Sequence, residues 1–179
     1  MSMIVDPSRF GSGAGSDGLD LDTVLSTGWR LVFEETLGAN IWIGQVQLRE
    51  SVGGSNVATH GSTGTASSPS TINSGFEPEK AFNNGASGDG WFTSVTGVGG
   101  AILDFTFDTP RNIKQIALKS PAASTTADFK RMIVQCLLDG TWINMAIHTN
   151  ETQFGTNETR LYSALVAAVF DVFVGDVYG

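Results

Sequence analysis

The sequence predicts an all-β fold of antiparallel strands, and three observations support this prediction. Apolar residues recur at every second position in several segments, for example at Trp29, Leu31 and Phe33. The dipeptide Asp139-Gly140 separates two such segments and is typical of a two-residue β-hairpin turn. The 179 residues include 22 glycines and few charged residues, which suits short strands joined by many turns.

The strands are expected in the following order. The first starts at Trp29, and the second covers 41–48, with Gly44 as a bulge site. Residues 51–79 form a long Ser- and Gly-rich loop that could hold a short strand at 56–60 or 64–67, and residues 78–82 suit one helical turn because Pro78 fits a first helical position. The remaining strands are expected at 101–107, 112–118, 129–138, 141–148, 160–165 and 169–174, with a turn at Thr109-Pro110.

Composition divides the chain into three parts. Residues 1–27 are rich in Gly, Ser and Asp and are expected to form a flexible arm, because they offer little apolar surface to bury. Residues 28–165 hold the predicted sandwich. Residues 166–179 are apolar on both faces of their expected strand, and such a strand is normally covered on both faces. This segment therefore predicts a homo-oligomer, with assembly contacts at Phe170, Phe173 and Tyr178.

Charge and composition argue against several classes of partner. The formal net charge is -8 and the ten basic residues are scattered, so no nucleic-acid partner is expected. The first 28 residues lack the apolar core of a signal peptide, and no apolar run is long enough for membrane insertion. Cys136 is the single cysteine, lies in an apolar context and is expected to be buried and unreactive.

Four segments follow one another in an order that suggests a family. They are Ala-Phe-Asn-Asn-Gly at 81–85, Trp-Phe-Thr-Ser at 91–94, Ala-Ile-Leu-Asp-Phe at 101–105, and the hairpin Val-Gln-Cys-Leu-Leu-Asp-Gly-Thr-Trp at 134–142. Together they resemble the discoidin, or coagulation-factor type C, domain over roughly residues 28–165. Segments 28–31 and 43–51 are similar to strands that normally close that domain, and here they come first. This order resembles a permuted form associated with bacteriophage tail and virion proteins.

The resemblance implies a fold and a function. The fold is an antiparallel jelly-roll β-sandwich of eight strands in two sheets. The function is that of a non-catalytic virion structural protein, a tail, fibre or decoration subunit. Its partners would be other virion proteins and a host cell-surface glycan, and a trimer would suit a phage appendage. Two alternatives stay open: a glycan-binding module of a bacterial surface protein or enzyme, and a hydrolase of unknown type.

The resemblance also raises a structural calcium, which the family often holds under its Ala-Phe-Asp-Gly turn. Asn83 stands where that turn has aspartate, and Gln45 matches a position where glutamate is common. Two amides in place of two carboxylates leave less charge to bind a hard cation. No cofactor is therefore expected, and a calcium ion held partly by backbone carbonyls of residues 84–87 is the alternative.

Candidate site residues are few. No catalytic residue is expected, because His60 and His148 occur without a nucleophile elbow, phosphate loop or metal-binding motif. Of the four tryptophans, three are expected to pack in the core or at its rim: Trp29, Trp91 and Trp142. Trp42 points opposite to its apolar neighbours and either covers a sheet face or meets a partner. Together with His60 and Phe92, Trp42 is a candidate ligand-binding residue.

Overall fold

The computed structural model describes residues 23–36, 40–70, 74–83, 90–94, 100–121, 129–150 and 152–165. Among the described residues, the short 3-10 helix η3 (Pro78–Phe82) lies between the fourth and fifth strands. The strands are β1 (Ser26–Thr36), β2 (Asn40–Ile43), β3 (Gln45–Arg49), β4 (Gly64–Ser67), β5 (Trp91–Ser94), β6 (Ala101–Arg111), β7 (Gln115–Lys119), β8 (Phe129–Leu138), β9 (Thr141–Thr149) and β10 (Thr159–Ser163). No helix within these ranges is long and apolar enough to cross a membrane.

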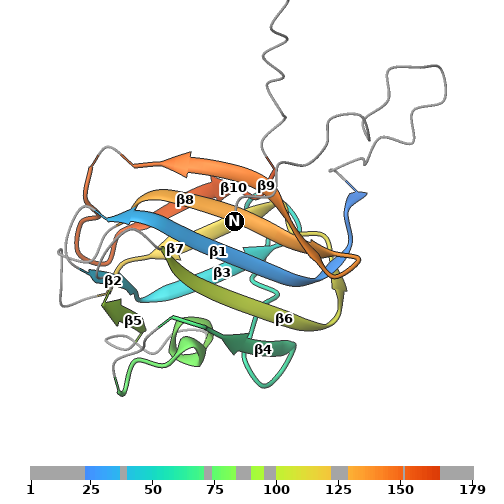
Figure 1. Cartoon of the computed structure of the whole chain (residues 1–179), viewed down its shortest axis with the longest axis horizontal. Coiled ribbons are helices and arrows are strands. Elements are labelled where there is room, and N and C mark those ends of the chain that lie inside the picture. The colour runs from blue at the N-terminus through green and yellow to red at the C-terminus, as the bar shows by residue number, and fades with distance from the viewer. Residues whose placement is uncertain are drawn as a thin grey trace, which may run out of the picture.

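The strands form three antiparallel sheets. A five-stranded sheet has the order β4-β6-β1-β8-β9, a three-stranded sheet has the order β10-β7-β3, and β2 pairs with β5. Figure 1 shows β8, β1 and β6 in front of β7 and β3, so the two larger sheets are stacked as layers. The predicted all-β class and antiparallel β-sandwich are confirmed, and the strands form three sheets where the resemblance implied two.

The core lies between the two larger sheets and is built by the predicted alternation. Trp29, Leu31 and Phe33 of β1 are buried, whereas the residues between them lie on the opposite face. The ring of Phe33 lies 4.9 Å from that of Phe129 in β8 and 5.9 Å from that of Trp91 in β5. Phe33 therefore connects the five-stranded sheet to the small sheet of β2 and β5.

The hairpin between β8 and β9 has the predicted turn. Asp139 has a φ of 48° and Gly140 a φ of 78°. Two successive residues with positive φ form a turn of type I′, whose twist matches that of the flanking strands. The strand β8 has the predicted bounds, and β9 extends one residue further than predicted, to Thr149. The predicted helical turn at 78–82 is also confirmed as η3, with proline in its first turn.

The second predicted strand, 41–48, is wrong as a single element. It is divided at Gly44 into β2, which pairs with β5, and β3, which pairs with β7. The Gly44 amide donates a hydrogen bond to the carbonyl of Lys119 at 2.9 Å. A Cβ at Gly44 would lie 2.9 Å from the backbone nitrogen of Pro121, so only glycine lets the chain pass this close while it changes sheets.

The turn expected at Thr109-Pro110 is also wrong, because β6 continues to Arg111. Arg111 pairs with Ser26 across an irregularity in the register, and Thr109 and Pro110 are exposed there. Proline is tolerated in a strand where the ladder is irregular, since it lacks the N–H that a regular ladder uses. The next strand, β7, consequently begins at Gln115, later than the predicted residue 112.

The sandwich begins before the predicted boundary at residue 28. The strand β1 starts at Ser26, whose hydroxyl donates to the carbonyl of Leu137 at 2.8 Å, and Val24 is buried in the core. The rest of the predicted arm, residues 1–22, lies outside the described residues. So does the predicted assembly segment 166–179, with Phe170, Phe173 and Tyr178.

Candidate functional site

Three aromatic side chains meet on the small sheet of β2 and β5, and we call them the aromatic cluster: Trp42, Phe76 and Phe92. Trp42 and Phe92 are direct partners in the register of the two strands. The ring centroids of Trp42 and Phe76 lie 5.4 Å apart, and each lies 5.7 Å from that of Phe92. All three side chains are half-buried. They therefore form a continuous aromatic surface that is partly open to solvent.

The alternation of the two strands holds the aromatic cluster outward. Ile41 and Ile43 in β2, and Trp91 in β5, are buried, so their neighbours Trp42 and Phe92 lie on the other face. The third ring comes from the loop before η3, where the Phe92 amide donates to the carbonyl of Phe76 at 3.3 Å.

A glycine allows β2 and β5 to approach each other. Gly90 has a φ of 142°, and a Cβ there would lie 2.4 Å from the carbonyl oxygen of Ile43. Any side chain at this position would push the start of β5 away from β2. Gly90 thus sets the spacing on which the contact between Trp42 and Phe92 depends.

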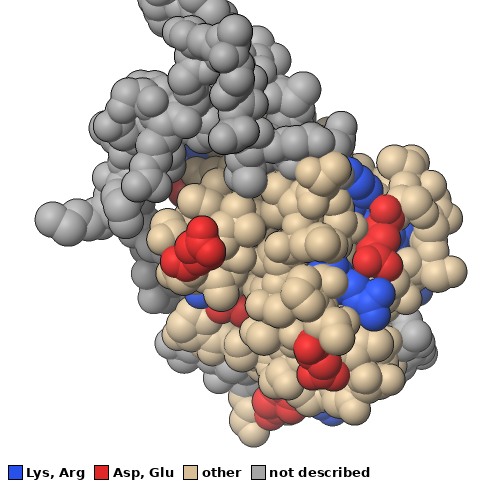
Figure 2. Space-filling view, turned by 90° about the vertical axis from the view of Figure 1, so that its right-hand side faces the viewer, with Lys and Arg blue, Asp and Glu red and all other residues tan. Residues whose placement is uncertain are grey.

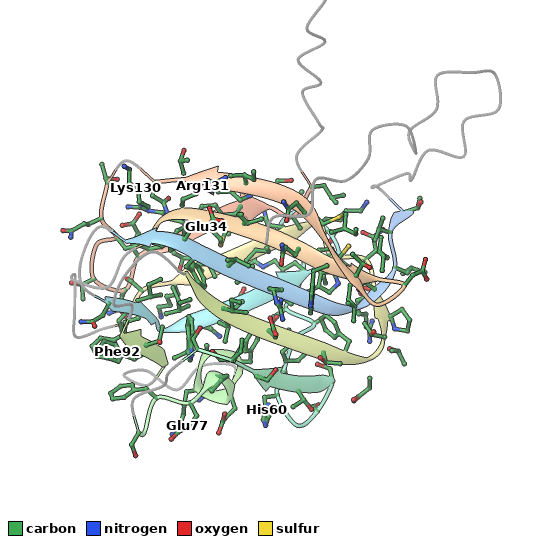
Figure 3. The ribbon with its side chains drawn as sticks, viewed as in Figure 1. Glu34, His60, Glu77, Phe92, Lys130 and Arg131 are labelled. Atoms are coloured by element: carbon green, nitrogen blue, oxygen red, sulfur yellow. The ribbon has the colours of Figure 1, made fainter. Side chains whose placement is uncertain are left out.

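Polar groups adjoin the aromatic cluster. The Nε1 atom of Trp42 is buried and has no hydrogen-bond partner among the described residues. The Glu77 carboxylate, next in sequence to Phe76, accepts a hydrogen bond from the Gly75 amide at 2.9 Å. Hydrogen bonds from the backbone amides of Gly75 and of Glu77 itself lower the pKa of the Glu77 carboxyl. Figure 3 shows Glu77 and Phe92 on the same lower side of the sandwich.

The arrangement is suited to a ligand with both an apolar face and hydroxyl groups. Aromatic rings provide a rigid apolar surface, and a few fixed polar groups orient what binds to it. Asn40 adds an amide on the same face of β2 as Trp42, because the two residues are two positions apart in a strand. Sugars combine these two properties, since their C–H faces pack on aromatic rings while their hydroxyls form hydrogen bonds.

His60 does not belong to the aromatic cluster. Figure 3 shows it beside β4, away from Phe92. Its Nδ1 accepts a hydrogen bond from the Ala66 amide at 3.0 Å, and its own amide donates to the carbonyl of Phe82 at 3.1 Å. His60 therefore holds the loop before β4 against η3. Sequence reasoning could place a histidine in this loop but could not show what the ring contacts.

The side chains of His148 and Cys136, like that of His60, are engaged within the fold. The Nε2 of His148 donates to the carbonyl of Ser163 at 2.7 Å, and the imidazole lies 5.1 Å from the ring of Tyr162. Burial lowers the pKa of His148, with the bond to Ser163 acting in the opposite direction. Cys136 is buried as predicted, and burial raises the pKa of its thiol to about 11. The thiolate needed for nucleophilic chemistry is thus disfavoured.

The donors proposed for calcium do not fit that ion. Gln45 lies in β3 directly opposite Lys119, whose positive charge opposes cation binding, and Asn83 is exposed after η3. Within the described ranges no three His, Cys, Asp or Glu side chains lie close enough to hold a metal. The backbone carbonyls of residues 84–87 lie outside those ranges.

Of the three tryptophans expected in the core or at its rim, two lie in the core and the third lies on an outer face. Trp29 and Trp91 are buried, whereas Trp142 is half-buried on the outer face of the five-stranded sheet, the face away from the three-stranded sheet. Gly28 makes room for it, because a Cβ there would lie 3.2 Å from the indole. The guanidinium of Arg30 lies 4.0 Å from the centre of the Trp142 ring. The indole of Trp142 therefore stacks against an ion-paired arginine, whose side chain remains 20% exposed.

The fold and the site define the chain as an antiparallel β-sandwich that carries a half-buried aromatic cluster on a small accessory sheet. No known family model, curated protein or solved structure matches the chain. On the side that Figure 2 presents, Lys and Arg side chains are interspersed with Asp and Glu.

Proposed function

We propose that the protein is a non-catalytic structural subunit of a bacteriophage particle, in a tail, fibre or decoration position, and that its aromatic cluster attaches to a glycan of the host surface. The observation that carries this proposal is the mutual contact of Trp42, Phe76 and Phe92 on one face of the β2–β5 sheet. Three half-buried rings in contact form a surface on which a sugar ring can lie.

The architecture supports the resemblance on which the virion assignment rests. The five- and three-stranded sheets together hold eight of the ten described strands, which matches the number that the resemblance implies, and β2 and β5 form an additional small sheet. The strand β1, the first of the described strands, lies in the middle of the larger sheet between β6 and β8. In a permuted order, a strand that normally closes the domain comes early in the chain, and the position of β1 agrees with such an order.

The engagement of the candidate acid–base groups favours a binding role over catalysis. His60 and His148 each hold a backbone group of the fold. Asp104 accepts two hydrogen bonds from Arg30, at 2.7 and 2.8 Å. A general base must reach the proton it removes from a substrate, and these side chains are instead directed at partners within the chain.

Glycan binding is tested with the full chain on an array of bacterial surface oligosaccharides, followed by calorimetric titration of the strongest binder. Trp42→Ala and Phe92→Ala are each expected to weaken binding about tenfold or more, since each removes one ring of the surface. Trp142→Ala is the matched control, because that tryptophan lies on another sheet and should leave affinity unchanged. Binding by Trp42→Ala equal to that of the unaltered protein would overturn the proposal for this site.

The virion location has its own test. Antibodies against the protein should label purified phage particles in electron micrographs. Labelling of uninfected bacteria alone would favour the first alternative, a glycan-binding module of a bacterial surface protein or enzyme. Release of new reducing ends from a bound oligosaccharide would favour the second alternative, a hydrolase.

A further inference from the structure

The outer face of the five-stranded sheet carries an apolar row between two charged rows. Antiparallel partners in register point to the same face, so the register of the sheet places four residues side by side across four strands: Ile102, Val32, Ile133 and Ile147. We call these four residues the isoleucine–valine row. Ile147, at the outermost strand β9, is 48% exposed, Val32 and Ile102 are half-buried, and Ile133 is 7% exposed. Figure 1 looks onto this face, with β8, β1 and β6 in front of the other sheet.

A polar row flanks the isoleucine–valine row on each side. On one side Arg30 of β1 pairs with Asp104 of β6. On the other side Glu34 of β1 forms an ion pair with Arg131 of β8. Figure 3 shows Glu34 and Arg131 near each other on these neighbouring strands. Along β1, therefore, a basic residue precedes the apolar Val32 by two positions and an acidic residue follows it by two.

From this pattern we propose that the outer face of the five-stranded sheet is a dimer interface with a second copy of the same chain. Two sheets that stack face to face keep their strands within about 30° of each other. Consider a two-fold axis that lies between the two sheets and runs parallel to the isoleucine–valine row. It stacks the row of one chain on the same row of the second chain. It also makes the strands of the two sheets run in opposite directions, so that Arg30 of each copy faces Glu34 of the other.

The charges of this arrangement are complementary without any in-chain pair being broken. They alternate along Asp104, Arg30, the second copy's Glu34 and the second copy's Arg131. Symmetry produces this series twice, once at each side of the apolar row. Placing an acid against a base on both sides favours this pairing over a parallel stack of the two sheets, in which Arg30 would face Arg30. The interface is separate from the aromatic cluster, which lies on the β2–β5 sheet.

The first test compares two exposed apolar residues in the full chain. Ile147→Glu would place a carboxylate inside the proposed interface and is expected to weaken self-association by roughly a hundredfold. Leu161→Glu is the matched control, because Leu161 is 55% exposed on β10 of the other sheet. Mass is measured by light scattering over a range of concentrations, against a monomer mass of 18.9 kDa, and circular dichroism confirms that each variant is folded.

The second test exchanges charges. The double variant Glu34→Arg with Arg131→Glu retains an ion pair within each chain but places an arginine opposite Arg30 of the second copy. It is expected to remain folded and to dimerise at least tenfold more weakly. A mass of 18.9 kDa for the unaltered protein at every concentration would overturn the proposal. So would equal masses for the unaltered protein and Ile147→Glu, or an equal loss of mass in Ile147→Glu and Leu161→Glu.

Discussion

Replacing Arg30 with alanine is expected to destabilise the folded protein by about 3 kcal/mol. The guanidinium donates two hydrogen bonds to Asp104, and the two side chains are only 20% and 13% exposed. Hydrogen bonds to charged groups contribute about 1.5–3 kcal/mol, and the contact with the Trp142 ring adds about 0.5–1 kcal/mol. The residual exposure of Asp104 keeps the cost below that of a fully buried unpaired charge, which reaches about 3–5 kcal/mol.

The assay is urea unfolding at a concentration where the protein is monomeric, combined with a double-mutant cycle. Arg30→Ala, Asp104→Ala and the double variant should give a coupling energy of about 1–3 kcal/mol. In thermal unfolding, 3 kcal/mol corresponds to a decrease in Tm of roughly 6–12 °C for a chain of this size. The slope of the urea transition should not change, because the surface exposed on unfolding is the same.

The control is the second ion pair on this face. Arg131 and Glu34 are both 35% exposed, so solvent screens their attraction and Arg131→Ala should cost less than about 1 kcal/mol. A coupling energy below about 0.5 kcal/mol for Arg30 and Asp104 would refute the reasoning. Equal costs for Arg30→Ala and Arg131→Ala would refute it as well, since burial would then have no effect on the strength of the pair.

Two further predictions concern backbone strain and pH. Gly90→Ala should destabilise the protein by about 1–3 kcal/mol in urea unfolding, because Gly90 has a positive φ and lies close to the carbonyl of Ile43. Gly140→Ala is the control, since φ is positive there but the space around it is open, and it should destabilise the protein less. Equal destabilisation by the two substitutions would exclude a clash at Gly90. The pKa of His148 is lowered from 6.5, so the unfolded chain takes up a proton first: stability should decrease as the pH falls below 6.5 and level off below the folded pKa. His148→Gln should flatten this part of the curve, and an unchanged curve would assign the pH dependence to another group.

Local patterns in the sequence account for most of the larger sheets. The bounds of β8 and its turn at Asp139-Gly140 follow from period-two alternation and a dipeptide that accepts positive φ. The division at Gly44 does not follow from local pattern, because the residue that requires glycine there, Pro121, is remote in sequence. The alternation slips by one residue at Gly44, with Ile41 and Ile43 buried before it and Val46 and Leu48 buried after it, and a bulge within one strand accounts for such a slip equally well.

The candidate site could be predicted only in part. Trp42 could be predicted because it lies between Ile41 and Ile43 and points to the face opposite theirs. Phe92 could be predicted because it lies in the Trp-Phe-Thr-Ser segment at 91–94. Phe76 was missed, since it lies in a loop rich in Ser and Gly and meets the other two rings only through tertiary structure. A large aromatic residue directly before Glu77 and Pro78 was the available signal, because such a residue in a polar loop needs a contact to bury it.

The central place of β1 has a consequence for how the chain folds as it is synthesised. Arg30 of β1 meets Asp104 of β6 across 74 residues, and Ser26 meets Leu137 of β8 across 111 residues. The ribosome therefore synthesises β1 well before β6 and β8. The apolar side of β1 has no partner until those strands have been synthesised. Contacts between residues far apart in sequence form slowly, whereas the β8–β9 hairpin can form as soon as both its strands have emerged. The hairpin is thus expected to fold first, and β1 to be the segment most exposed to chaperones or to aggregation until β8 arrives.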